Sequence, residues 1–328
     1  MKKALTIAAL LGLAGAAQAQ VTIYGLIDVS YGANKVEVNG GSTAHDAIHF
    51  GTGSQGNSTS RIGFKGASDV GSGMKVNFQL EGGIARDGGK IGFDRQMWAG
   101  VSGGFGEIRA GRQDSVLFQS LAGFDDNGAA NDTFVGNYNG VPIAGRFTTQ
   151  LAQYISPSFS GLTVRAGFTP EGNFKDNTDA VTTAKTKDNQ AIFAVAANYS
   201  AGPFSAALAY ESKGDSGGKD LIVAAGSYDL GVAKVNAVYA DGGQNQKGYK
   251  VGVSAPLAGA TVGVAYSQNA DTKNSGTEFF ANKEVLKNTY AYVDVGTFHR
   301  DTASADATVF SRAKGDYQIY SVGMMFVF

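Results

Sequence analysis

The sequence contains no cysteine, only five prolines and only three histidines. The lack of cysteine excludes a secreted fold that is held together by disulfide bonds. Few prolines beside 47 glycines, 20 phenylalanines and 14 tyrosines favour a protein of many strands, tight turns and aromatic side chains. Beyond its start the chain also lacks an apolar run of the roughly 20 residues that a transmembrane helix needs.

The chain also lacks a large net charge of either sign. The formal net charge is −1, and it becomes −3 if Lys2 and Lys3 are removed during export. A value this small excludes a strongly basic nucleic-acid-binding protein, so no nucleic acid partner is expected.

Residues 1–19 have the pattern of a secretory signal peptide. Met1-Lys2-Lys3 is a short basic start, Ala4 to Gly15 is an apolar run, and Ala17-Gln18-Ala19 fits a small-x-small cleavage site. The apolar run is too short to span a bilayer as a helix, and it has no polar face. We therefore predict export of the chain, with residues 20–328 as a single domain.

The last residues, Tyr317–Phe328, predict a strand with one continuous apolar face. Alternate residues of a strand point to the same side, and here that side carries Tyr320, Val322, Met324, Phe326 and Phe328. A soluble sheet would bury such a face in a core. A barrel in the outer membrane turns it toward lipid and closes its last strand on its first.

The same alternation recurs along the chain, most clearly where Met74, Val76, Phe78 and Leu80 alternate with polar residues. Short turns with glycine or proline separate these runs from longer polar stretches, among them 34–58, 114–145 and 171–190. This pattern predicts an all-β, antiparallel meander β-barrel of about sixteen transmembrane strands.

A soluble solenoid or sandwich is the alternative fold. Such a fold would not need aromatic side chains near so many strand ends. A solenoid would also show a fixed repeat period, and none is visible. Eight aromatic residues are expected to form girdles at the membrane interfaces: Phe64, Trp98, Tyr199, Phe204, Tyr210, Tyr239, Tyr266 and Phe298.

Catalytic chemistry has little support. His45 and His49 flank Asp46 in a polar stretch, and His299 lies beside Arg300 at a strand end. Such histidines are usually solvated or paired at a rim, and no local serine–histidine arrangement accompanies them. The GxGxxG match at 51–56 lacks the surrounding βαβ pattern. We therefore predict no enzyme activity, no metal site and no cofactor.

The longest polar stretch, Asp114 to Gly145, is expected to fold into the lumen. A barrel of about sixteen strands leaves an aqueous channel, so a sieve needs an element that narrows it. Ser120–Phe124 is apolar enough to pack against a wall. The stretch also carries acids but no lysine or arginine: Asp114, Asp125, Asp126 and Asp132.

Basic residues on the inward faces of nearby strands are the predicted counterparts of these acids. Arg146 is placed on one face with Thr148, Gln150 and Tyr154, opposite Leu151. A basic wall facing an acidic loop sets up a transverse field that orients solutes and tunes ion selectivity. The predicted wall residues are Arg61, Lys65, Arg95, Arg146 and Arg165.

Taken in order, five segments resemble the general trimeric porins of Gram-negative bacteria, in the neisserial and β-proteobacterial branch. They are Val21–Asp28, Ser60–Gly66, Gly104–Gln113, Tyr154–Gly161 and Gly323–Phe328. The resemblance implies a homotrimer of sixteen-stranded barrels, each a separate pore with its third loop in the lumen. It also implies an arginine cluster facing acids on that loop, and Arg61, Arg95 and Arg146 fall at the matching places.

The chain departs from the family pattern in the third loop. Leu121–Asp125 stands where the family often has Pro-Glu-Phe-Gly-Gly, and Gln150–Leu151 stands where Asn-Ser is usual. These departures leave the geometry of the constriction open, and with it the sign of selectivity, for which we expect a slight preference for anions.

The predicted function is passive diffusion of ions and small hydrophilic solutes across the outer membrane. A barrel that works mainly as a surface adhesin or enzyme scaffold is the alternative. Besides outer-membrane lipid, the expected partners are two further copies of the chain and the barrel assembly machinery. Read against the family, Phe328 is the expected recognition signal for that machinery.

Overall fold

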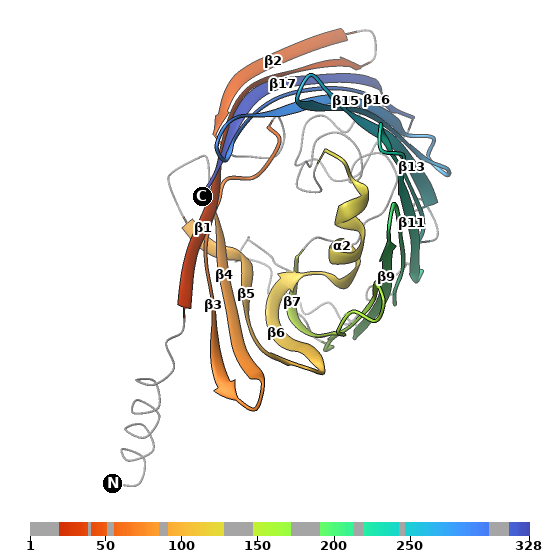
Figure 1. Cartoon of the computed structure of the whole chain (residues 1–328). Helices are drawn as coiled ribbons and strands as arrows, with labels where there is room; N and C mark the ends of the chain where they lie inside the picture. Colours follow the sequence, from red (N-terminus) through yellow and green to blue (C-terminus); the bar gives the residue numbers. More distant parts are fainter. Residues whose placement is uncertain are drawn as a thin grey trace.

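The computed structural model describes residues 20–38, 41–50, 56–84, 91–127, 147–171, 191–212, 219–242, 247–301 and 315–328. Most of them lie in strands that form one sheet (Figure 1). The strands are β1 (Gln20–Val38), β2 (Gly41–Phe50), β3 (Arg61–Gly71), β4 (Met74–Ile84), β5 (Ile91–Gly103), β6 (Gly106–Asp114), β7 (Phe147–Ile155), β8 (Leu162–Thr169), β9 (Ile192–Ala201), β10 (Phe204–Glu211), β11 (Leu221–Asp229), β12 (Lys234–Asp241), β13 (Lys247–Leu257), β14 (Ala260–Asn269), β15 (Ser275–Leu286), β16 (Thr289–Arg300) and β17 (Gly315–Val327).

Sixteen of these strands, β1 and β3–β17, close into a barrel of antiparallel neighbours. The first part of β1 pairs with β3, from Gln20↔Ala67 to Leu26↔Arg61. Its second part pairs with β17, from Leu26↔Val327 to Glu37↔Asp316. Closure satisfies the backbone groups that a free sheet edge would expose. The predicted sixteen-stranded meander barrel is confirmed.

The additional strand β2 corrects one boundary. The polar stretch 34–58 was expected to be a loop, but β1 continues to Val38 and β2 pairs with it from Val29↔Phe50 to Val38↔Gly41. Residues 41–50 show no period-two hydrophobic pattern in the sequence, so the alternation that marks the other strands does not reveal this hairpin.

The apolar side of β17 faces outward, as predicted from its alternation. Tyr320, Val322, Met324 and Phe326 are all exposed on the outer surface, whereas Ser321 between them is 3% exposed and faces the lumen. The barrel therefore presents the apolar face of β17 to lipid. Transferring this face from water to hydrocarbon is favourable by about 25 cal/mol per Å² of apolar surface.

The carboxy-terminal residue closes the seam next to β1. The backbone of Phe328 exchanges two hydrogen bonds with Gly25, at 2.9 and 3.1 Å. The Phe328 ring also lies directly over Gly25, where an added Cβ would come within 2.3 Å of the ring. Only glycine accommodates the ring at this position, and Phe326 stacks beside it with ring centroids 5.9 Å apart.

Aromatic pairs mark both ends of the outer surface. Phe168 pairs with Phe193 at the end with the long connections, and Tyr199 pairs with Phe204 at the short-turn end. Two of the expected girdle residues face the lumen instead, so their assignment was wrong. Trp98 lies under the guanidinium of Arg109, and Phe298 is buried against Tyr317.

The connection after β6 turns into the lumen (Figure 1). It forms helix α2 (Val116–Leu121) and the 3-10 turn η1 (Ala122–Phe124), and the Ser115 hydroxyl caps α2 by accepting a hydrogen bond from the Phe118 N–H. In the part of the chain that the structure describes, no helix has both the length and the apolar character to cross a membrane.

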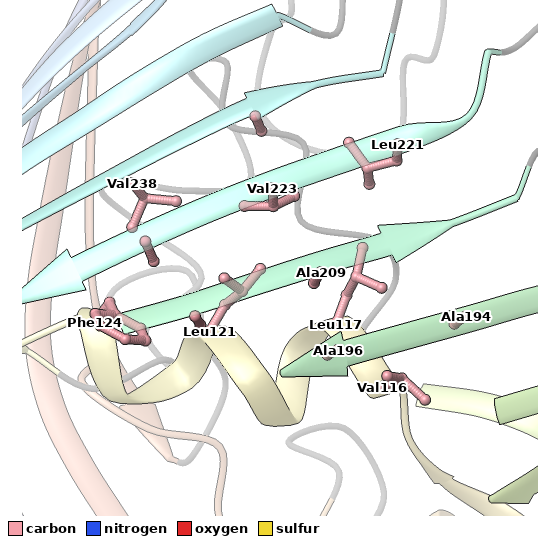
Figure 2. Packing of buried hydrophobic residues seen from close by; sticks show 13 residues of the cluster. Val116, Leu117, Leu121, Phe124, Ala194, Ala196, Ala209, Leu221, Val223 and Val238 are labelled. Carbon is pink, nitrogen blue, oxygen red and sulfur yellow. The ribbon is translucent and has the colours of Figure 1, made fainter. Parts of the chain in front are cut away.

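The inward fold of this loop rests on an apolar contact with the barrel wall. Val116 and Leu117 are 1% and 0% exposed. They pack with Leu121 and Phe124 against small and branched side chains of β9–β12 (Figure 2), namely Ala194, Ala196, Ala207, Ala209, Leu221, Val223, Ala225, Val238 and Ala240. Burying one leucine or valine side chain contributes about 1.5–3 kcal/mol. The predicted packing of Ser120–Phe124 against a wall is confirmed, and it extends back to Val116.

Candidate channel constriction

The loop runs on from η1 as a polar tip, Asp125–Asn127, along the next strands of the wall. Asp125 Oδ1 lies 3.0 Å from Lys250 Nζ on β13. Asp126 Oδ1 lies 2.8 Å from Lys234 Nζ on β12. The other Asp126 oxygen accepts hydrogen bonds from Asn236 and Ser254. Both loop acids are thus engaged by the wall on which the loop rests.

Asn127 joins the tip to two buried carboxylates. Its Nδ2 donates to Glu278 Oε1 at 2.5 Å and to Asp294 Oδ1 at 2.9 Å. Glu278 on β15 and Asp294 on β16 are 2% and 0% exposed. A buried acceptor that loses its hydrogen-bond donor is costly, so this amide fixes where the tip lies.

A second segment also reaches the tip from inside the barrel. Residues 56–60, which lead into β3, place Asn57 Nδ2 3.2 Å from Asn127 Oδ1. The Asn57 N–H donates to the Tyr292 hydroxyl, and that hydroxyl donates to Asp28 Oδ1. Asp28 also accepts the Ser58 N–H at 2.6 Å. Asp28 is 1% exposed, which gives a structural reason for the acid that ends the first family-like segment, Val21–Asp28.

Two predicted basic residues, Arg61 and Arg95, meet at Glu81 on β4. Arg95 Nε lies 2.6 Å from Glu81 Oε1, and Arg61 Nε lies 3.9 Å from Glu81 Oε2. A bulge turns Arg95 inward, because residues 93–95 of β5 stand opposite Gly82 of β4. Arg61 also donates to the Ser58 hydroxyl and the Thr59 carbonyl, so it supports the 56–60 segment.

Lys65 lies on the same inner face of β3 but is exposed. Its Nζ is 5.2 Å from the centre of the Tyr24 ring, a cation–π contact with a residue of β1. The Tyr24 hydroxyl donates to Glu81 and accepts from Gln79. The basic wall is therefore a connected network across β1, β3, β4 and β5.

Arg165 takes a different place from the other predicted cations. It donates to Asn198 Oδ1 at 2.7 Å, and Asn198 in turn donates to the Ser120 carbonyl of α2. Arg109 behaves similarly: it donates to Gln119 of α2 and to Gln153 of β7, with its guanidinium 4.6 Å from the Trp98 ring. Both arginines brace the loop, although Arg109 was not among the predicted wall residues.

Asp114 is the one remaining predicted residue within the described part of the chain. Asp114 ends β6 and accepts a hydrogen bond from the Gln96 side chain at 2.9 Å. Arg146 and Asp132 lie outside the described residues. Their predicted roles therefore stay predictions.

The predicted faces of β7 are partly wrong. Leu151 and Gln153 are buried on the inner side, whereas Tyr154 is on the outer side and donates to the Phe105 carbonyl. A bulge is the cause, because Thr149 and Gln150 together oppose a single residue of β6, and Gln150 has a φ of 55°. The extra residue reverses the alternation between Thr148 and Leu151.

The described residues give no metal centre by geometry, since no group of three or more histidine, aspartate or glutamate side chains among them could hold an ion. His299 lies at the end of β16, with Nδ1 2.7 Å from Asp316 and Nε2 3.6 Å from Asp301. The side chains of His45 and His49 on β2 lie outside the described part of the chain.

Comparison with known proteins decides the family. The family model described as "Gram-negative porin" matches residues 4–304. The chain belongs to the Gram-negative porin family. Outer membrane porin protein 32 of Delftia acidovorans is 33% identical over 283 residues, which cover 79% of this chain and 77% of that protein. An outer membrane porin of Bordetella pertussis is 33% identical over 83% of this chain and 78% of its own length.

A solved structure agrees with these relatives. The anion-selective porin from Comamonas acidovorans is similar with a TM-score of 0.75 and 25% identity, over 95% of this chain and all of that one. This porin is thus a protein of the outer membrane and forms a channel through it, with the loop after β6 lying inside the barrel (Figure 1).

Proposed function

We propose that the channel passes ions and small hydrophilic solutes by passive diffusion, with a preference for anions. The observation that carries the proposal is the distribution of charge around the lumen. Arg61 and Arg95 meet at Glu81 on one wall, where Lys65 lies over the Tyr24 ring. The loop acids Asp125 and Asp126 are held by lysines on another wall. A lumen wall with excess positive charge raises the local concentration of anions. The anion selectivity named for the Comamonas porin is in line with this.

The wall arginines and the loop are proposed to form the constriction together. The wall contributes Arg61, Lys65 and Arg95, with Arg146, which precedes β7 in the sequence, as a further proposed member. Arg165 contributes indirectly, because it holds Asn198 under the loop backbone. On the loop side the members are Asp114, Asp125 and Asp126. Diffusion through such a gap needs no covalent step, so the chain is proposed to act as a channel and not as an enzyme.

Planar-bilayer recordings test both parts of the proposal. Purified protein is expected to give stepwise ion currents, and a potassium chloride gradient should give a reversal potential of the sign for anions. Replacing Arg61, Arg95 and Arg146 by glutamine should move that potential toward cations. Absence of stepwise current would contradict the channel itself and favour a surface adhesin or scaffold. An unchanged potential in the triple variant would contradict only the assigned wall.

Assembly is proposed to follow the family. The chain would be exported with residues 1–19 as a signal peptide, inserted by the barrel assembly machinery and associated as a homotrimer. Phe328 is the proposed insertion signal, and its ring also fills the space over Gly25. Deleting Phe328 should lower the amount of folded barrel in the outer membrane while the channels that do form conduct normally. Gly25→Ala is the matched variant, because it disturbs the same seam but keeps the signal.

A further inference from the structure

We propose that Lys234 and Lys250 are specificity-determining residues of the channel. By pairing with Asp126 and Asp125, they cancel the negative charge of these two loop acids and leave the sign of selectivity to the basic wall. This inference rests on the proposed channel function and deepens it. It assigns a role in selectivity to two lysines, on β12 and β13, that no loop or arginine motif marks.

The geometry makes both contacts specific. Lys234 Nζ lies 2.8 Å from Asp126 Oδ1, and Lys250 Nζ lies 3.0 Å from Asp125 Oδ1. The two lysines are on the inner faces of neighbouring strands, where Lys234 pairs with Ser254 in the β12–β13 register. The Asp126 carboxylate is further oriented by Asn236 and Ser254, so it is held toward this wall.

Burial differs between the two pairs. The side chains of Lys234 and Asp126 are 37% and 7% exposed, whereas those of Lys250 and Asp125 are 6% and 19% exposed. The partly exposed Lys234 reaches the lumen and can be changed with little disturbance of packing. Lys250 is enclosed, and removing one member of an enclosed pair leaves a buried charge without its counterion.

A close ion pair acts on a passing ion as a dipole and not as a charge. An unpaired carboxylate at about 8 Å changes the energy of a monovalent ion in water by an amount that corresponds to roughly a twofold change in its local concentration. The effect has opposite signs for anions and cations, so loss of one lysine should change the permeability ratio by roughly fourfold. Salt should weaken the change, because the Debye length falls from about 30 Å at 0.01 M to about 3 Å at 1 M.

The experiment compares single and compensated variants in planar bilayers. Lys234→Gln should shift the reversal potential toward cations, by roughly a fourfold change in permeability ratio at about 0.01 M salt and by much less at about 1 M salt. Asp126→Asn should shift it toward anions. The double variant K234Q/D126N and the charge swap K234D/D126K both conserve net charge, so both should return the potential close to that of the unaltered protein.

The outcomes separate this inference from the proposed function. If the unaltered protein gives no stepwise current, the channel proposal fails. If it conducts with a defined selectivity but K234Q leaves the reversal potential unchanged at low salt, the role of Lys234 is overturned while the channel stands. The same holds if the double variant shifts as far as K234Q alone. Should K234Q not fold, the charge swap still decides, because it must then fold and keep the original selectivity.

For the enclosed pair, Lys250→Met with Asp125→Asn gives the parallel test. The double replacement removes both charges together and should keep the selectivity of the unaltered channel. A shift toward anions in this variant would mean that Asp125 had contributed free negative charge to the lumen, and would overturn the role of Lys250.

Discussion

The inward loop is held in two different ways at its two ends. Its foot, residues Val116–Phe124, is bound to β9–β12 mainly by apolar burial. Its tip, residues Asp125–Asn127, is bound to β12, β13, β15 and β16 by ion pairs and hydrogen bonds. Burial is strong and nondirectional, whereas polar contacts depend on distance and angle. The foot therefore decides whether the loop stays in the lumen, and the tip decides where in the lumen it lies.

The largest effect is expected from breaking the foot. Leu117→Asp places a charge at a fully buried site between Ala, Val and Leu side chains, which costs on the order of 4 kcal/mol or more. The loop should leave the wall, so single-channel conductance should rise and the conductance distribution should broaden. Leu117→Met is the matched control, because it conserves volume and costs less than about 1.5 kcal/mol. Normal conductance in Leu117→Asp would contradict the role of the foot.

A smaller effect is expected from breaking the tip. Asn127→Leu removes the donor shared by Glu278 and Asp294, and a typical hydrogen bond contributes about 0.5–1.5 kcal/mol. The foot stays in place, so mean conductance should change little while current fluctuations within the open level increase. Single-channel noise analysis measures this.

Asn57→Ala serves as the graded comparison for the tip. It removes the side-chain contact with Asn127 Oδ1 but keeps the Asn57 N–H bond to Tyr292. Its excess noise should lie between that of the unaltered channel and that of Asn127→Leu. Equal noise in all three proteins would mean that the tip position does not depend on these contacts.

The sequence predicted the barrel and the Ser120–Phe124 part of the foot, because both rest on patterns that are local in the chain. Alternation over ten residues is enough to identify a lipid-facing strand such as β17. In the same way, an apolar run such as Ser120–Phe124 within a polar loop is conspicuous and implies burial. The β1–β2 hairpin and the inner face of β7 were missed, since a polar hairpin has no hydrophobic period and a bulge at Thr149–Gln150 shifts the period by one.

The tip could not be predicted for a different reason. Asp126 and Lys234 are separated by 108 residues, and Asn127 and Asp294 by 167. A lumen-facing lysine looks alike in every strand, so nothing near Lys234 or Lys250 in the sequence indicates which acid it meets. The expected pairing of loop acids with the wall arginines used charge alone, whereas the loop's path along β12–β16 decides which bases lie within reach.

The smallest effect, and the sharpest test of the comparison, is the coupling between foot and tip. If the two attachments are independent, the losses in unfolding free energy from Leu117→Ala and Asn127→Ala should add to within about 0.5 kcal/mol in the double variant. Independence is expected because helix α2, which carries Leu117, lies against β9 and β10, whereas Asn127 is bonded to β15 and β16. Reversible denaturant unfolding of the refolded barrel measures all three changes. A coupling above about 1 kcal/mol would mean that the loop is released as one rigid unit, in which case the tip fixes the foot as much as the foot fixes the tip.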